Sequence, residues 1–374
     1  MPLINHAYGG GGTPQLCAQV ENFRVIPGIL SAILSWKAPE PDEDNSFVGA
    51  RIVRKTGSAP NGINDGTVVY EGTALSYTDT GLTNGTTYYY RAFAYNDKRK
   101  YQTAKKVVSL VAIAVDSTLN NNEWNVIKLV SDAGQGANYW SIGDRKAVTL
   151  NGTVGKLSLS NVTTYAFIIG FNHNEELEGS NRIHFQIGKT ALSGGTDVCL
   201  CDSAYPTNIS ATGYFSMNRN ATNSGGWAKS QMRTNICGTS LSSYFGTIIA
   251  VIPAALRAVL KSVTKYTNNT GDSSVASAVT ATTDYFFLLS EFEVFGSISH
   301  ANKNEKSKQA QYAYYSAGNS KIKYKHDDIS TAATWRLRSP LIGTSWQFVS
   351  VDADGKAYAS TAETSLGFAP CFCV

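Results

Sequence analysis

The sequence predicts an all-β sandwich followed by an α+β domain, and three patterns carry this prediction. Residues 13–112 alternate apolar and polar side chains in short runs separated by turn signals, which is typical of an antiparallel sandwich. From residue 117 onward, helical and strand patterns mix without a regular βαβ repeat, which indicates α+β architecture. The chain ends in an apolar run over residues 368–374, which we expect to close a sheet because an apolar end is unfavourable in water.

The composition narrows the function classes. Charged residues make up 16% of the chain, below the roughly 25% of an average globular protein. The remaining polar surface of Ser, Thr, Asn, Gly and Tyr suits extracellular binding proteins and virion proteins, because Tyr gives contact area at low entropic cost. A net charge of +4 gives no electrostatic case for nucleic acid binding. No stretch of 18 apolar residues is present, so we expect no membrane span.

The first 14 residues predict an attachment arm rather than a secretory signal. They lack a basic start and a long apolar stretch, and they end in the flexible run Gly9-Gly10-Gly11-Gly12. The preceding residues 3–10 resemble the short N-terminal arm of many small phage tail proteins, which implies binding to other tail or baseplate proteins of a virion. A protein without a secretory signal would leave the cell by lysis or as part of a particle.

Within the first domain, which we place at residues 15–112, strands are expected at residues 31–36, 49–55, 67–70 and 86–95. Trp36, Leu82 and Tyr88 then resemble the core tryptophan and the tyrosine corner of the fibronectin type III family. In that corner the tyrosine hydroxyl bonds back to the backbone. The resemblance implies a fibronectin type III spacer or presentation module without catalytic chemistry.

The second domain, placed at residues 113–374, opens with a helix in which Trp124, Ile127 and Val130 share one face. A buried stretch is expected at residues 245–256, and an Asp-Gly turn within residues 346–361 predicts a hairpin. Further strands are expected at 147–150, 165–171, 182–187, 258–266 and 284–294, and further helices at 226–234 and 309–316.

Six segments in this domain resemble an uncharacterised domain family common in prophage and phage-tail proteins. They are residues 139–144, 170–174, 226–233, 289–294, 337–340 and 367–370. The last two segments, Leu-Arg-Ser-Pro and Gly-Phe-Ala-Pro, also look like the ending of a C-type-lectin-like fold. In lectin-like binders the ligand contacts lie between these two landmarks, which implies residues 343–361 here.

Two groups of ionisable residues are candidates for chemistry. His173 and His184, with Glu175, Glu176 and Glu178 between them, could bind a metal or transfer protons, but hydrogen-bonded structural histidines are the favoured interpretation.

Glu291 and Glu293 are expected on one face of a strand, where Arg233, Arg336 or Arg338 could neutralise them. They could form an acid and base pair, but an ion pair that supports the sheet is favoured.

The cysteines at positions 17, 199, 201, 237, 371 and 373 allow three interpretations. Free buried thiols come first, disulfides second, and a zinc site built from the two Cys-x-Cys pairs third, because zinc sites usually have a longer spacing. Residues 352–355 match half of a calcium loop, which a hairpin turn explains. The sequence contains no Gly-x-Ser-x-Gly nucleophile motif, no His-Glu-x-x-His zinc-protease motif, no phosphate loop and no Gly-x-Gly-x-x-Gly dinucleotide motif. We therefore expect no enzyme activity, no cofactor and no metal.

The candidate ligand-binding residues are aromatic and polar residues near the end of the chain. They are Trp346, Gln347, Tyr358, Ser345 and Tyr312. Aromatic rings beside amide and hydroxyl groups suit sugars, because the rings stack on C–H faces and the polar groups bond to hydroxyls. Trp346 and Tyr312 could equally belong to the core.

These observations lead to the hypothesis of a phage tail fibre or receptor-binding protein that recognises the bacterial host surface. A surface carbohydrate is the favoured ligand, and a surface protein is the alternative. The predicted location is the virion, assembled in the bacterial cytoplasm, and the expected oligomer is a homotrimer that would raise a weak sugar affinity by multivalency. Two alternatives remain open: a structural baseplate or decoration protein without a ligand, and a surface-polysaccharide hydrolase.

Overall fold

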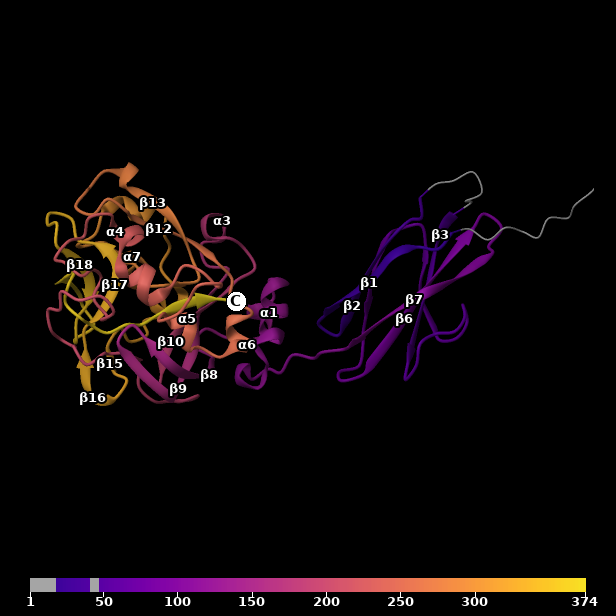
Figure 1. Ribbon diagram of the computed structural model, residues 1–374, viewed down its shortest axis with the longest axis horizontal. Helices are drawn as coiled ribbons and strands as arrows, with labels where there is room; N and C mark the ends of the chain where they lie inside the picture. The colour runs from indigo at the N-terminus through magenta and orange to yellow at the C-terminus, as the bar shows by residue number, and fades with distance from the viewer. Residues whose placement is uncertain (1–17, 41–46) are drawn as a thin grey trace, which may run out of the picture. The chain divides into compact units, whose positions relative to one another are not determined.

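The computed structural model describes residues 18–40 and 47–374 and is shown in Figure 1. It divides the chain into two compact units, Met1–Val115 and Asp116–Val374. The sequence-based boundary lay between residues 112 and 113. The predicted attachment arm, residues 1–14, and Cys17 lie outside the described residues.

The first unit is a β-sandwich of two antiparallel sheets. The strand order is β1-β2-β5 in one sheet and β4-β3-β6-β7 in the other, which is the order of a fibronectin type III-like fold. The strands are β1 (Glu21–Gly28), β2 (Ser31–Lys37), β3 (Phe47–Thr56), β4 (Thr67–Gly72), β5 (Ser76–Thr80), β6 (Thr87–Asn96) and β7 (Tyr101–Val111). The four predicted strands correspond to β2, β3, β4 and β6, while β1, β5 and β7 were not predicted.

Trp36 and Tyr88 take the positions that the sequence predicted in this sandwich. Trp36 is 6% exposed and packs its ring against Phe23 and Tyr70, with centroids 6.2 and 5.5 Å away. The Tyr88 hydroxyl accepts a hydrogen bond of 3.0 Å from the backbone N–H of Thr83, which is the backbone contact of a tyrosine corner.

The central sheet of the second unit has the order β14-β20-β10-β9-β8. Its strands are β8 (Arg145–Val154), β9 (Leu157–Phe171), β10 (Ile183–Lys189), β14 (Phe286–Phe287) and β20 (Cys371–Cys373). Phe372 of β20 stacks on Phe185 at 5.2 Å, and Trp124 of helix α1 (Trp124–Asp132) packs edge-on against both rings. The apolar end of the chain therefore closes a sheet, as predicted, and it does so between two other strands.

Three smaller sheets complete this unit, with orders β17-β18-β19, β11-β15-β16 and β12-β13. The predicted hairpin is confirmed as β18 and β19, which are joined by the turn at residues 352–356. Figure 1 shows β17 and β18 at the side of the unit opposite α1. The strands are β11 (Val198–Cys199), β12 (Val263–Asn268), β13 (Val279–Asp284), β15 (Lys323–Lys325), β16 (Asp328–Ala333), β17 (Trp335–Pro340), β18 (Gln347–Val351) and β19 (Ala357–Thr361).

The helices between the strands are short. They are α2 (Gly136–Tyr139), α3 (Glu175–Glu178), α4 (Gly226–Lys229), α5 (Ile248–Val251), α6 (Ala254–Arg257), α7 (Glu291–Phe295), α8 (Ala313–Ser316), the 3-10 turns η1 (Leu119–Asn121), η3 (Ala276–Ala278) and η4 (Lys303–Ser307), and the π-helix η2 (Met232–Cys237). Among the described helices, none combines the length and apolarity that a membrane crossing requires.

The strand predicted at residues 284–294 is wrong in its second half, which is helix α7. Ser290 caps this helix: its hydroxyl accepts from the backbone N–H of Glu293, and the Glu293 carboxylate accepts from the backbone N–H of Ser290. This reciprocal capping box starts a helix despite the alternating pattern around it. The predicted buried stretch at 245–256 also begins too early, because Phe245 is fully exposed and burial starts at Thr247.

Candidate functional site

The predicted ligand-binding residues are not all at the surface. Trp346 is 47% exposed and Tyr358 is 56% exposed. Ser345 is exposed and Gln347 is half-buried, both next to Trp346 at the start of β18.

Tyr312 must be removed from this group, because its side chain is completely buried. Its hydroxyl accepts a hydrogen bond of 2.9 Å from the Lys265 ammonium and lies 3.0 Å from Nδ1 of His184. Tyr312 is therefore a core residue, the alternative that the sequence had left open.

Residues 341–347, which we call the anchored loop, hold Trp346 at the surface. The buried side chain of Asn223 points its amide nitrogen at the carbonyl oxygens of Leu341, Thr344 and Gln347, at 3.1, 2.8 and 3.0 Å. The backbone N–H of Asn223 also donates to the carbonyl of Ser345 at 2.8 Å. A single buried residue from a distant segment thus fixes the loop from beneath, so the loop is ordered before any ligand arrives.

Glu291 supports the same loop from a second direction. Its carboxylate accepts hydrogen bonds from the backbone N–H groups of Ser299, His300 and Ala301 at 2.7 to 3.1 Å. The carbonyl of His300 in turn accepts from the backbone N–H of Ile342 in the anchored loop. Glu291 is therefore a backbone-binding residue, and the ion pair predicted for it with arginine is not formed.

Tyr358 lies in β19, opposite Ser350 of β18, whereas Trp346 lies in the bend that immediately precedes β18. Trp346 is four residues before Ser350, and four strand positions correspond to roughly 13 Å. Phe348 and Ser350 between them are completely buried. The two exposed rings therefore form two separate contact points, not one continuous platform.

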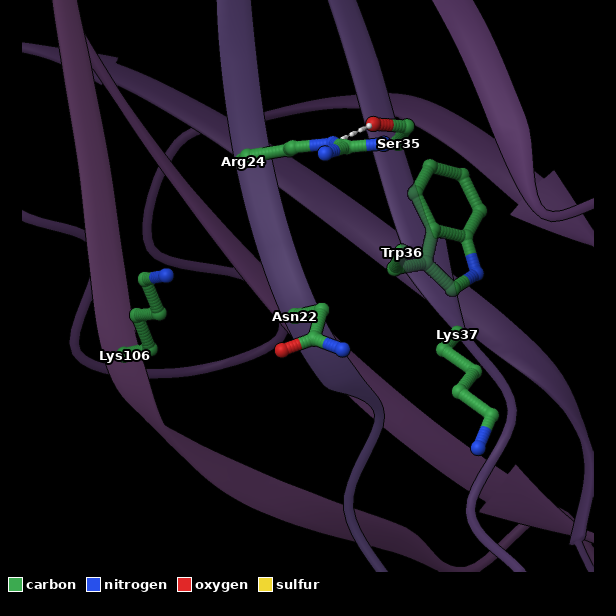
Figure 2. Close-up of a pocket in the computed structure, with 6 residues that line it drawn as sticks. All are labelled: Asn22, Arg24, Ser35, Trp36, Lys37 and Lys106. Carbon is green, nitrogen blue, oxygen red and sulfur yellow. Dashed lines mark hydrogen bonds between the residues drawn. The ribbon is translucent and has the colours of Figure 1, made fainter.

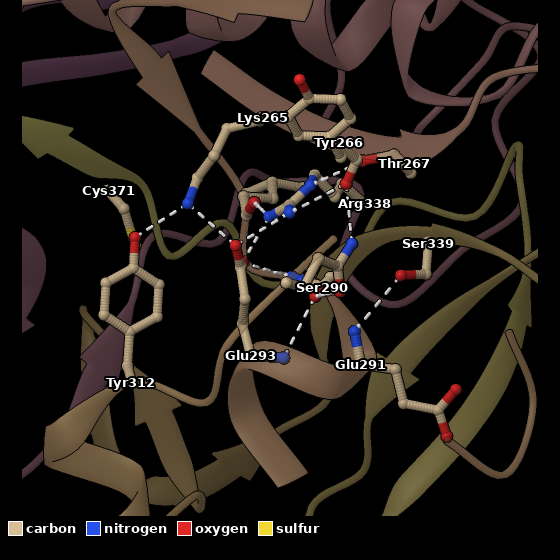
Figure 3. A network of polar contacts seen from close by, with 12 residues as sticks. Lys265, Tyr266, Thr267, Ser290, Glu291, Glu293, Tyr312, Arg338, Ser339 and Cys371 are labelled. Atoms are coloured by element: carbon tan, nitrogen blue, oxygen red, sulfur yellow. Dashed lines mark hydrogen bonds and ion pairs between the residues drawn. The ribbon is translucent and has the colours of Figure 1, made fainter. Parts of the chain in front are cut away.

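The second unit also contains a buried ionic cluster, which we define as Glu178, Lys265, Glu293 and Arg338. Figure 3 shows the last three of these residues. The Lys265 ammonium donates to Glu178 at 2.7 Å and to Glu293 at 2.8 Å. Arg338 forms a two-pronged contact with Glu293, of which the Nη2 bond is 2.8 Å. All four side chains are at most 2% exposed. The predicted ion pair of Glu293 with Arg338 is confirmed, while Arg233 and Arg336 are elsewhere.

Burial and charge act in opposite directions on the carboxyl groups of this region. Burial by itself would raise the pKa of Glu293, but the Arg338 guanidinium and the Lys265 ammonium outweigh it and hold that pKa below its usual range. For Glu178 burial prevails and raises the pKa to about 7. Burial likewise raises the pKa of Glu305 to about 7, although the carboxyl accepts from the backbone N–H of Asn268 and the Ser339 hydroxyl.

His173, Glu178 and Glu293 could by their atom types hold a metal, because their ligand atoms lie within 4.8 Å of one another. The Lys265 ammonium, however, already lies within hydrogen-bond distance of both carboxylates. A metal ion would have to displace this buried cation, so the residues fit a lysine-centred ion network better than a metal.

His173 lies beside the cluster and His184 beside Tyr312, both as neutral rings. His173 stacks on Tyr312 with a centroid distance of 3.6 Å, and His184 approaches the Cys373 thiol at 3.3 Å. Burial lowers the pKa of His173 to about 3 and that of His184 well below its usual value. Burial and ring packing support a structural role for both residues, while their Nε2 atoms have no hydrogen-bond partner among the described residues.

The two Cys-x-Cys pairs lie in separate segments of the second unit. The sulfurs of Cys199 and Cys201 are 4.0 Å apart, whereas Cys371 and Cys373 are in β20. The five described cysteines are buried and unpaired, and in the described parts of the chain the thiols do not assemble into a metal-ligating group.

Sequence reasoning missed Asn223 as the residue that anchors the loop. Nothing in the local sequence distinguishes it from its neighbours, because its three acceptors are about 120 residues away.

Comparisons with known proteins cover parts of the chain. Residues 207–374 match a family model described as a domain of unknown function (DUF6273). No curated protein matches the chain.

Among solved structures, one match is the fibronectin type-III domain of human fibronectin type III domain containing protein 3. It is 22% identical, covers 31% of this chain and all of that domain, and has a TM-score of 0.21. Another is titin kinase and its flanking domains, at 10% identity, covering 47% of this chain and 30% of that chain with a TM-score of 0.24. The fibronectin type III-like fold of the first unit follows from its own strand order and tyrosine corner, and the chain is similar to the DUF6273 family over its last 168 residues.

Proposed function

We propose that this protein is a receptor-binding or tail-fibre protein of a phage that recognises carbohydrate on the bacterial host surface through the anchored loop. The observation that carries the proposal is the exposed Trp346 on a loop that the buried Asn223 fixes through three backbone acceptors. An exposed indole ring on a loop that is already ordered offers a contact surface at low entropic cost.

The chemistry around Trp346 suits a sugar. The indole ring can stack on the C–H face of a sugar ring, while the exposed Ser345 and the half-buried Gln347 offer a hydroxyl and an amide to its hydroxyl groups. Tyr358, roughly 13 Å along the hairpin, offers a second stacking point. This spacing favours an extended oligosaccharide over a single sugar unit.

In this proposal the first unit is the spacer and the second unit is the C-type-lectin-like tip. The segments Leu337-Arg338-Ser339-Pro340 and Gly367-Phe368-Ala369-Pro370 enclose the anchored loop and the hairpin, as the lectin-like ligand region does. Assembly as a homotrimer on a virion would multiply a weak affinity per site. Virion partners would bind the N-terminal arm.

The polysaccharide hydrolase alternative gains no support from Glu291 and Glu293. Their side chains are 1% and 0% exposed, and their oxygens bind backbone N–H groups and buried cations.

The test is binding of the full-length chain to bacterial cells and to a glycan panel. We expect binding to selected glycans, at least about tenfold weaker in Trp346→Ala, because exposed anchoring tryptophans dominate binding surfaces. Asn223→Ala should weaken the same binding although residue 346 is still tryptophan, because the loop loses its anchor. Phe245→Ala is the matched control, because Phe245 is a fully exposed aromatic residue outside the anchored loop.

Two results would overturn the proposal. Binding that survives Trp346→Ala unchanged would place recognition elsewhere. A correctly assembled oligomer that binds no host strain and no glycan would instead favour the structural role in the virion.

A further inference from the structure

A polar pocket of about 450 Å³ lies at one edge of the first unit, and Figure 2 shows the side chains around it. The lining residues are Asn22 and Arg24 from β1, Ser35, Trp36 and Lys37 from β2, and Lys106 from β7. β1 and β7 are the edge strands of different sheets. The pocket therefore lies at the β1 edge of its sheet, where Arg24 and Ser35 are on the side of the strands opposite to the buried Trp36 ring.

A bulge in β1 shapes one wall of this pocket. The pairing of β1 with β2 shifts register between Glu21 and Arg24, and Asn22 has a φ of 49° in the left-handed region. Bulges at sheet edges bend the strand and redirect its side chains. Here Phe23 remains in the core at 1% exposure, while Asn22 and Arg24 on either side of it line the pocket.

Among the described residues, the lining is cationic and includes no carboxylate. Arg24 donates from Nε to the Ser35 hydroxyl at 2.9 Å, which orients its guanidinium. Among the described residues, neither Arg24 nor Lys106 forms an ion pair, whereas Lys37 pairs with Glu40. Cations gathered in a concave site of low-dielectric walls concentrate a positive potential, which attracts anions.

Neutral groups accompany these cations. The Asn22 amide and the Ser35 hydroxyl can bond to hydroxyl groups of a ligand, and the nearly buried Trp36 borders the pocket. The indole Nε1 of Trp36 is buried without a hydrogen-bond partner within the described residues. Cations together with an amide and a hydroxyl match a charged sugar better than a bare ion, and the volume is within the range of small-ligand pockets.

We propose that this pocket binds an anionic oligosaccharide, with its carboxylate or phosphate group near Arg24 and Lys106 and its hydroxyl groups at Asn22 and Ser35. The first unit is then a second binding unit and not only a spacer. This inference uses no residue of the anchored loop, so it stands or falls separately from the proposed function.

The experiment is titration calorimetry on the full-length chain at low salt, about 50 mM, where screening is weak. The probes are trigalacturonate for a carboxylate, inorganic tripolyphosphate for a phosphate, and neutral maltotriose for an uncharged sugar. We expect at least one anionic probe to bind and its affinity to fall as salt rises. The probe that binds more tightly identifies the anionic group that the pocket prefers.

Variants locate the binding. Arg24→Ala and Lys106→Ala should each weaken the anionic probe about tenfold, the scale of one charge-assisted hydrogen bond. Lys98→Ala, an exposed cation of the same unit outside the pocket, is the matched control and should change the affinity less than about twofold. Trp346→Ala should leave this binding intact.

The inference is overturned if neither anionic probe binds, if maltotriose binds equally well, or if Lys98→Ala weakens binding as much as Arg24→Ala. The last result would indicate diffuse attraction by the net positive charge. Because Arg24 and Lys106 are exposed, thermal unfolding of both variants should match the unmodified chain, which excludes loss of fold as the cause.

Discussion

The buried ionic cluster makes a quantitative prediction about Glu293. In Glu293→Gln the side chain keeps its shape and its oxygen can still accept from the backbone N–H of Ser290, so the helix cap is preserved. What disappears is the negative charge. Lys265 retains Glu178 as a partner, whereas Arg338 loses the carboxylate it contacts and keeps neutral acceptors such as Thr267 and the carbonyl of Leu288.

The magnitude follows from complete burial. Glu293 and Arg338 are both 0% exposed, so water cannot replace the lost partner. Removing one member of a buried ion pair costs about 3–5 kcal/mol, because the other charge stays buried and uncompensated. Such a loss is a large part of the roughly 5–15 kcal/mol that stabilises a typical folded protein.

The assay is urea unfolding of the full-length chain, with the transition of the second unit followed by near-UV circular dichroism. Glu176→Gln, an exposed glutamate in α3 close in sequence to the cluster, is the matched control and should change the free energy of unfolding by less than about 0.5 kcal/mol. Adding Arg338→Met to Glu293→Gln should recover part of the loss, since the unpaired charge is then removed. A loss below about 1 kcal/mol for Glu293→Gln would refute the reasoning.

Two further predictions concern stability. Because the folded pKa of Glu305 is raised to about 7 from 4.5, the folded chain binds one more proton than the unfolded chain between these values, and its stability falls as pH rises through them. Glu305→Gln should remove this dependence. In urea unfolding, the free energy of unfolding of the unmodified chain should fall by roughly 3 kcal/mol relative to that of the variant between pH 4.5 and pH 7.5. A change of opposite sign would contradict the assignment. Phe372→Ala should destabilise the second unit by about 3–5 kcal/mol in the same assay, because the completely buried ring contacts Phe185, Phe286 and Trp124. If the free energy of unfolding changes no more than for substitution of an exposed residue, the sheet does not depend on this ring.

Much of the architecture could be predicted from local patterns. Alternation identified the hairpin of β18 and β19, and helical spacing of apolar residues identified α1. The same alternation misled at residues 289–294, because the capping box of Ser290 and Glu293 determines the structure there. This signal was present in the sequence as Ser-x-x-Glu.

The site itself was less predictable, for a different physical reason. Trp346 is exposed and Tyr312 is buried, although both have aromatic and polar neighbours in the sequence. The difference depends on which distant segments of the chain cover each side chain. The anchoring of residues 341–347 by Asn223, and the contact of Glu293 with Lys265, join segments far apart in the chain. Such contacts have no local signature.

The position of β20 between β14 and β10 has a consequence for how the second unit is made. Gln186 of β10 pairs with Cys371 of β20, so about 185 residues must be synthesised before β10 gains its second neighbour. At about 5–20 residues per second, that edge of β10 stays open for roughly 10–40 s during translation. An open strand edge is a template for pairing with other chains. We therefore expect slow translation or a lack of chaperones to cause aggregation through the second unit, while the sandwich, made earlier from contacts within its own hundred residues, escapes this hazard.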